Sequence, residues 1–355
     1  RMLEARDYHA KNLRLREKAG DEAGIAVSSN NLGNAYKNLG QYREAAGYYD
    51  RSRETFEKLG NIRNLTVVTT NLGILYNLMG DPDRALDLLR AALSSAESLS
   101  DGILIAKAHD AIGDLLTLTG NYRLSLDELN QALKIRQDLK SPWDVAESYN
   151  NIGLVFQAQS DHRQALSYFA KALAANQQLG DKSLEAESRL SSAVEMLALG
   201  QWKQALEEFE IGRRISEEAG RKVLTAEAYR GTGRIYLRLG NRSEALRVLT
   251  LAQAIQEEIG DKTGLAETMV ELADAYRQNG EAAKALQLAS DAADLAQSVS
   301  RSETFWQAKL VSAKVLRTLG RNKESAADLD EAIAAVEELR LQVAGPAASL
   351  PSFFG

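Results

Sequence analysis

The sequence of 355 residues predicts an all-α solenoid, a stack of antiparallel helix pairs that grows by adding equal repeats. Three observations predict it. A pattern of residues returns every 40 positions, a glycine follows most of the expected helices, and small residues occupy fixed places inside them. A period between about 20 and 50 residues is typical of repeat architectures, so this period outweighs the two or three globular domains that length alone would suggest.

The repeating pattern is clearest in the stretch from Asn30 to Ala45, an amphipathic helix that ends at Gly40 and is followed at once by another helix. One small residue marks each copy of the stretch, without a slip in spacing. It is found at Gly33, Gly73, Gly113, Gly153, Ala193, Gly233, Ala273 and Ala313.

Taken in order, residues 1–20 are expected to form a leading half-repeat, a lone helix that aligns with the second helix of a repeat. Residues 21–340 follow as eight helix pairs of 40 residues. The first pair has helices from about 22 to 39 and from about 42 to 59. Residues 341–355 are expected to be a tail or the start of a missing C-terminal domain.

Glycine is expected just after each helix, where the left-handed backbone is costly for other residues. These glycines are Gly20, Gly40, Gly60, Gly80, Gly120, Gly180, Gly200, Gly220, Gly240, Gly260, Gly280 and Gly320. An N-cap for the next helix is expected from the residue that follows many of them. These are Asp21, Asn61, Asp81, Asn121, Asp181, Asn241 and Asp261.

Glycine inside a helix costs about 1 kcal/mol relative to alanine, so its recurrence needs a packing reason. We expect the second helix of each pair to approach the first closely there, with a large side chain filling the gap. Candidate large residues on the second helix are Tyr49, Leu89, Leu129, Phe169, Phe209 and Leu249.

Composition narrows the possible functions. The net charge of -6 gives no general attraction for nucleic acid or an anionic membrane, and no run of residues is apolar enough to span a bilayer. The absence of cysteine excludes disulfides and thiolate chemistry, and a cytoplasmic location fits this composition best. The three histidines His9, His109 and His162 lie in different repeats, so no catalytic residue, metal site or cofactor is expected.

The order Leu-Gly-x-x-Tyr, then Gly-x-Tyr-x-x-Ala, resembles the tetratricopeptide repeat (TPR), whose usual unit is 34 residues. The 40-residue units are similar to those of the Leu-Gly-Asn adaptor and kinesin light chain. This resemblance implies a right-handed superhelix with a concave groove lined by the first helix of each pair. The run from Glu337 to Phe354 also resembles the junction before the CHAT domain of bacterial TPR proteins.

The resemblance also implies which side chains face the groove. A polar set that could bind the backbone of an extended peptide is Asn30, Asn31, Asn34, Asn38, Asn71, Asn77, Asn150, Asn151 and Gln157. A different role is open for Asn31, Asn71 and Asn151, which could bond a neighbouring helix and specify packing, whereas Asn34 and Asn38 are expected to face a ligand.

Further along, Leu190 and Val194 are expected to form an apolar floor. Arg230, Arg234 and Arg238 are spaced four apart and form one stripe on a helix. That stripe could hold carboxylates or phosphates, or it could pair with the acidic residues of the next repeat.

These patterns predict a protein interaction scaffold, not an enzyme, that binds a peptide or protein segment in its groove. The alternative is a regulatory or sensor region that controls an attached effector domain, such as a CHAT protease-like domain. A monomer is expected, although the uncovered first helix could mediate self-association.

Overall fold

The structure, a computed structural model, describes residues 2–344. These residues form seventeen α-helices and no strand, so the predicted all-α class is confirmed. The helices, in order, are α1 (Met2–Ala19), α2 (Glu22–Asn38), α3 (Tyr42–Lys58), α4 (Ile62–Leu78), α5 (Pro82–Ser98), α6 (Gly102–Leu118), α7 (Tyr122–Asp138), α8 (Pro142–Ala158), α9 (His162–Leu179), α10 (Lys182–Ala198), α11 (Trp202–Glu218), α12 (Lys222–Arg238), α13 (Arg242–Ile259), α14 (Lys262–Gln278), α15 (Ala282–Ser298), α16 (Ser302–Thr318) and α17 (Asn322–Ala344).

From α2 on, the even-numbered helices are the first of each pair and are called A helices, and the odd-numbered ones are B helices. The predicted bounds of the first pair agree with α2 and α3 to within one residue. The lone helix expected at the start is α1. Of residues 341–355, expected as a tail or the start of another domain, 341–344 form the end of α17, and 345–355 lie outside the described part of the chain, as does most of the sequence that resembles a CHAT junction.

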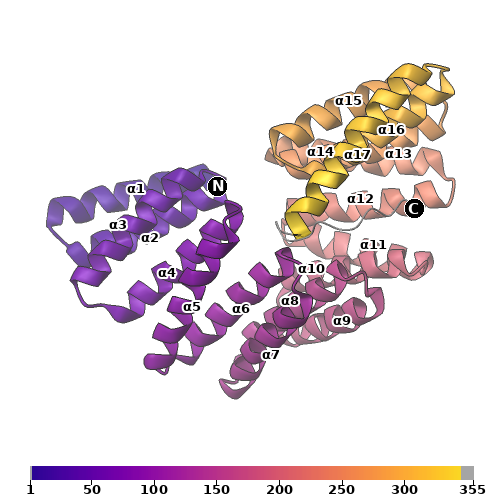
Figure 1. Ribbon diagram of the computed structural model, residues 1–355. Coiled ribbons are helices and arrows are strands. Elements are labelled where there is room, and N and C mark those ends of the chain that lie inside the picture. Colours follow the sequence, from indigo (N-terminus) through magenta and orange to yellow (C-terminus); the bar gives the residue numbers. More distant parts are fainter. Residues whose placement is uncertain (1, 345–355) are drawn as a thin grey trace, which may run out of the picture. The chain divides into compact units, whose positions relative to one another are not determined.

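The chain divides into two compact units, Arg1–Val155 and Phe156–Gly355, called here the N-terminal and the C-terminal unit. From α1 to α7, and again from α9 to α17, each helix packs against the helices before and after it (Figure 1). Consecutive A helices also touch within each unit, for example α12 with α14 and α14 with α16. The A helices of the C-terminal unit therefore form one continuous face.

The predicted close approach of A and B helices is confirmed at the recurring glycines. A Cβ atom added to Gly33 would lie 2.7 Å from Cδ1 of Tyr49, which is fully buried on the B helix of the same pair. The same holds one repeat later, where a Cβ on Gly73 would lie 2.6 Å from Cγ of Leu89. Glycine is required there because the large B-helix side chain occupies the space a methyl group would take.

All the glycines expected after helices have a positive φ, as predicted. At four equivalent positions the chain instead places other residues in this backbone conformation, with φ between 51° and 58°: Ser100, Lys140, Ser160 and Ser300. These four turns keep the geometry without glycine, so the stacking of the helices dictates the turn.

Most of the predicted N-caps are confirmed, since the side chains of Asp21, Asn61 and Asp261 accept hydrogen bonds from the first turn of the next helix. The prediction for Asn121 is wrong. Its side chain makes no cap bond, because its Nδ2 donates to Oγ1 of Thr119 at 3.1 Å instead.

We predict that Gly33→Ala destabilises the protein by about 1–2 kcal/mol, because overpacking against the buried Tyr49 ring outweighs the better helix propensity of alanine. Chemical denaturation measures the effect. The matched control is Gly47→Ala on α3, where nothing lies within 4 Å of the added methyl group. This variant should gain about 0.5–1 kcal/mol. Equal effects of the two substitutions would contradict the packing role of Gly33.

Candidate functional site

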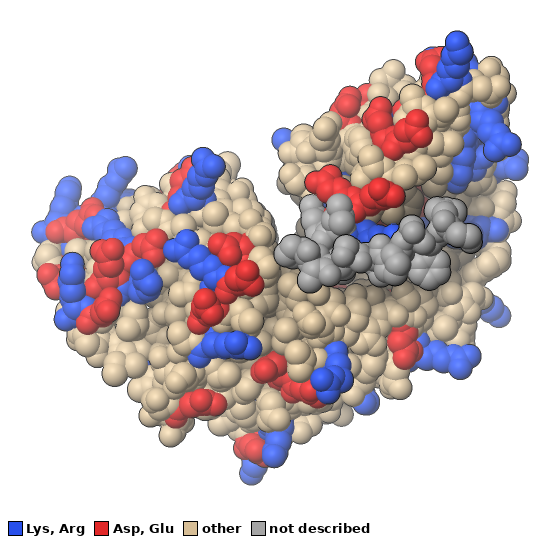
Figure 2. Space-filling model, in the orientation of Figure 1, with Lys and Arg blue, Asp and Glu red and all other residues tan. Residues whose placement is uncertain are grey.

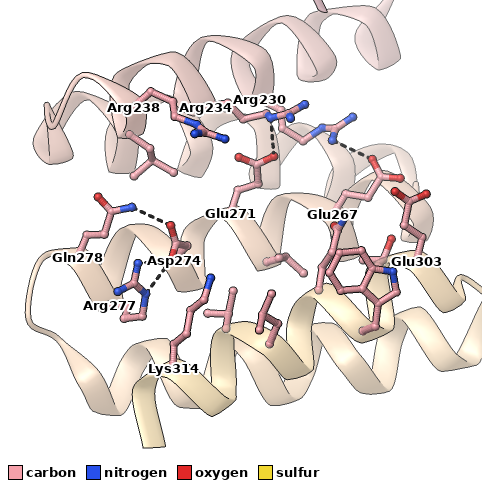
Figure 3. A pocket seen from close by; sticks show the side chains of 17 residues that line it. Arg230, Arg234, Arg238, Glu267, Glu271, Asp274, Arg277, Gln278, Glu303 and Lys314 are labelled. Atoms are coloured by element: carbon pink, nitrogen blue, oxygen red, sulfur yellow. Dashed lines mark hydrogen bonds and ion pairs between the residues drawn. The ribbon is translucent and has the colours of Figure 1, made fainter. Parts of the chain in front are cut away.

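The A helices of the C-terminal unit enclose a hollow of about 690 Å³, the charged hollow, between α12, α14 and α16. Five basic and four acidic side chains line it, together with apolar ones (Figure 3). Its lining residues are Arg230, Arg234, Leu237, Arg238, Glu267, Val270, Glu271, Asp274, Arg277, Gln278, Glu303, Thr304, Trp306, Gln307, Leu310, Val311 and Lys314.

Ion pairs join α12 to α14 across this hollow. Arg230 lies 2.9 Å from Glu267, and Nε of Arg234 lies 3.3 Å from Oε1 of Glu271 (Figure 3). Burial raises the pKa of Glu271, and the neighbouring Arg234 and Arg230 oppose that rise. The arginine stripe could hold a ligand or pair with the next repeat. Arg230 and Arg234 pair with the next repeat.

Arg238, the third member of the stripe, behaves differently. It is exposed, and among the described residues it has no acidic partner. Position 238 is the last residue of α12, so its side chain lies at the end of the hollow where the A helices finish. One residue of the predicted stripe thus stays available to a ligand.

A second hollow of about 300 Å³, the apolar-floored hollow, lies between α10 and α12. Leu190, Val194, Phe209 and Leu224 line its floor, and Glu187, Glu227 and Gln157 lie at its rim. Burial raises the pKa of Glu227, and the nearby Arg230 opposes the rise. The predicted apolar floor is thus brought together with the arginine stripe, because Arg230 and Arg234 line both hollows.

The predicted asparagines all belong to the N-terminal unit. Three of them take part in hydrogen bonds to other side chains of this unit. Nδ2 of Asn71 donates to Oδ1 of Asn30 at 2.9 Å, which joins two neighbouring A helices. Oδ1 of Asn34 accepts a 2.6 Å bond from the hydroxyl of Tyr49, so this oxygen is occupied within the protein, and contact of Asn34 with a ligand stays a prediction. The buried tyrosine needs a partner for its hydroxyl, and Asn34 supplies it.

The other predicted asparagines make no side-chain hydrogen bond within residues 2–344: Asn31, Asn38, Asn77, Asn150 and Asn151. Asn38 is exposed and the rest are partly buried. Gln157 belongs to the C-terminal unit, where its Nε2 donates to Oε1 of Glu195, a side chain that is 1% exposed. These five asparagines stay candidates for backbone binding, while Gln157 is already occupied.

Glu303, Trp306 and Lys314 are among the residues of the charged hollow that sequence reasoning missed. Their repeat resembles the first one only weakly, so its groove-facing positions are hard to recognise from the sequence. The 40-residue period could have found Lys314, since it occupies the same repeat position as Arg234 and Asp274.

A buried arginine in the N-terminal unit was also missed. Arg136 on α7 is 4% exposed, pairs with Asp110 and Glu147, and donates to Oγ of Ser148 at 2.7 Å. Burial raises the pKa of Asp110 to about 7 against the effect of Arg136, and the like charges of Glu147 and Asp114 add to the rise. Three carboxyl groups thus share one guanidinium.

This cluster predicts a pH dependence of stability. Because the pKa of Asp110 is higher in the folded state than in the unfolded chain, the folded state holds a proton that unfolding releases, and stability falls as pH rises from about 4 to about 7. Asp114→Asn removes a like charge and should reduce the loss of stability between about pH 5 and about pH 8. Urea denaturation at both pH values measures it.

Asp87→Asn is the control, since Asp87 is exposed on α5 and makes no ion pair within the described residues. This variant should lose as much stability over the interval as the unchanged protein. An Asp114→Asn variant with the same loss would show that the cluster does not couple to folding.

The described residues contain no group of three or more His, Asp or Glu side chains arranged to hold a metal ion. His109 and His162 each contact a glutamate, Glu128 at 2.6 Å and Glu195 at 2.8 Å, respectively. Within residues 2–344, no helix has the length and apolar character needed to cross a membrane.

The stacked helix pairs define the class of protein, an α-solenoid built from repeated helix pairs. The family model described as tetratricopeptide repeat matches residues 1–58, 65–138, 144–210, 193–258 and 224–298. The chain therefore belongs to the tetratricopeptide repeat family, as its resemblance predicted. No match was found among curated proteins.

Solved structures share this fold at low identity. The apo form of RapI is 17% identical, with a TM-score of 0.64, and the match covers 78% of this chain and 98% of that one. A STAND protein with a tetratricopeptide repeat sensor from Pyrococcus horikoshii is 16% identical, with a TM-score of 0.63, covering 95% and 54%. The Rap conjugation gene regulator of plasmid pLS20, in complex with the Phr* peptide, is 14% identical, with a TM-score of 0.57, covering 93% and 80%.

Proposed function

We propose that this chain binds a peptide or an extended protein segment on the A face of its C-terminal unit, defined as the surface of α10, α12, α14 and α16 that carries the two hollows. The observation that carries the proposal is that the two hollows share the lining residues Arg230 and Arg234 and so adjoin each other; together they are called the depression. The chain acts by binding and not by catalysis.

The chemistry of the depression suits a peptide. Its floor offers apolar surface from Val194 and Leu237, while its walls carry donors and acceptors that can meet a peptide backbone. Arg230 and Arg234 are held in place by their ion pairs, so the walls that they form lose little side-chain entropy when a ligand packs against them. A peptide complex of a structural neighbour, the Phr* complex, supports the same use of the fold.

The unpartnered asparagines of the N-terminal unit are proposed as an additional backbone-binding surface, with the exposed Asn38 the most accessible of them. The alternative role, a sensor region that controls an attached effector, uses the same binding event. The sensor role is distinguished from a plain scaffold by whether a bound peptide changes the activity of an attached effector domain.

Val194→Trp should abolish peptide binding to the A face, because the added indole fills much of the 300 Å³ hollow. The measurement is selection of a phage-displayed random nonapeptide library on immobilised protein, followed by fluorescence anisotropy with the enriched peptides.

Val223→Trp is the matched control, since Val223 is exposed at the start of α12 and lines neither hollow. This variant should retain binding. Two results would overturn the proposed function: no peptide enriched on the unchanged protein, or peptides that bind Val194→Trp as well as they bind Val223→Trp.

A further inference from the structure

The charged hollow has a surplus of positive charge at one end. Figure 3 shows Arg238, Arg277 and Lys314 toward the end where the A helices finish, and Glu267 and Glu303 toward the other end. The three A helices run in the same direction, because each pair is separated by an antiparallel B helix. The hollow therefore has an acidic end and a basic end.

The acidic residues of the hollow do not neutralise this surplus. Glu267 and Glu271 are paired with Arg230 and Arg234. Asp274 is also occupied, since its Oδ1 accepts from Arg277 at 2.7 Å and its Oδ2 accepts from Gln278 at 2.7 Å.

The fourth acid, Glu303, is too distant. It precedes Lys314 by eleven residues on α16, and a helix rises about 1.5 Å per residue, so the two lie roughly 16 Å apart along the axis. Arg238 and Lys314 are thus the two cations of the hollow that have no acidic partner among the described residues.

Arg238 and Lys314 approach the hollow from opposite walls, α12 and α16, on either side of α14 (Figure 3). Both are exposed, so a ligand can reach them at little desolvation cost. A guanidinium and an ammonium that are not yet paired bind carboxylates through charge-assisted hydrogen bonds.

Resting on the proposed function, we infer that the A face selects acidic peptide segments, whose Asp or Glu side chains bind Arg238 and Lys314. A side-chain carboxylate fits this geometry better than a chain terminus. The two cations lie at one edge of the depression, and an extended peptide that crosses the A helices turns alternate side chains toward that edge.

The charge of the whole chain does not account for such selection. The net charge of the whole chain is -6, so acidic peptides are not attracted by the protein as a whole. The face of the molecule that Figure 2 shows carries acidic as well as basic side chains. Selection of acidic segments must come from a local site.

The test uses the full chain and the same random nonapeptide library, with C-terminal amides on all synthetic peptides so that only side chains supply carboxylates. Peptides selected on the unchanged protein should be enriched in Asp and Glu. Replacing the acidic residues of the strongest peptide by Asn or Gln should weaken its binding at least about tenfold, and raising salt from about 50 to about 500 mM should weaken it as well.

The double variant Arg238→Glu with Lys314→Glu should lose the acidic enrichment and favour Lys and Arg instead. The matched control is Arg214→Glu with Lys323→Glu, which makes the same charge change at exposed positions on α11 and α17 outside both hollows. This control should select acidic peptides as the unchanged protein does. Circular dichroism confirms that both double variants are folded.

The outcomes separate the inference from the proposed function. Peptides that bind the A face without acidic enrichment, or whose enrichment survives the Arg238 and Lys314 substitutions, would overturn the inference and leave peptide binding intact. A library that yields no peptide binder at all would overturn both, beginning with the proposed function.

Discussion

Each repeat depends on how closely its A helix approaches its B helix. The approach needs a small residue on the A helix: at Gly33 and Gly73 that helix has no side chain, and a buried tyrosine or leucine of the B helix fills the space. Because the same contact recurs with a period of 40 residues, the A helices of successive repeats lie side by side. The face that carries both hollows is a consequence of this packing.

The polar side chains of the A helices serve two purposes that compete, bonding to the next repeat and binding a ligand. Ion pairs such as Arg230 with Glu267 join one repeat to the next, and so does the amide bond between Asn71 and Asn30. Every group used in this way is withdrawn from a ligand. The polar groups that remain for binding are those that make no bond between repeats. In the charged hollow, the cations without an acidic partner among the described residues are Arg238 and Lys314.

The two units distribute charge differently across their A helices. In the N-terminal unit the guanidinium of Arg136, on the B helix α7, lies near three carboxyl groups of A helices, and burial raises the pKa of Asp110. In the C-terminal unit the arginines alternate with acids and leave a basic end. One fold therefore supports two electrostatic environments, because A-helix surface positions vary from repeat to repeat while the packing positions do not.

Much of the fold could be read from particular residues. The period located every helix pair, Gly33 and its equivalents indicated which faces pack, and the glycines after helices marked the turns. Local rules failed at Asn121, whose side chain bonds Thr119 instead of capping a helix, and at Ser160 and its three counterparts, where stacking imposes a left-handed backbone on residues that do not favour it. The packing of the two helices sets the backbone conformation of the turn between them, even where the turn residue does not favour that conformation.

The sequence by itself determined the all-α repeat architecture, since periodicity, helix ends and small residues are all local signals. It also placed Leu190, Val194 and the arginine stripe on one face. Only the tertiary structure decided which of these side chains are free. Asn34 bonds to Tyr49, and Arg230 pairs with the acid of the next repeat. Both contacts depend on distances between residues of different helices, which spacing along the sequence does not specify.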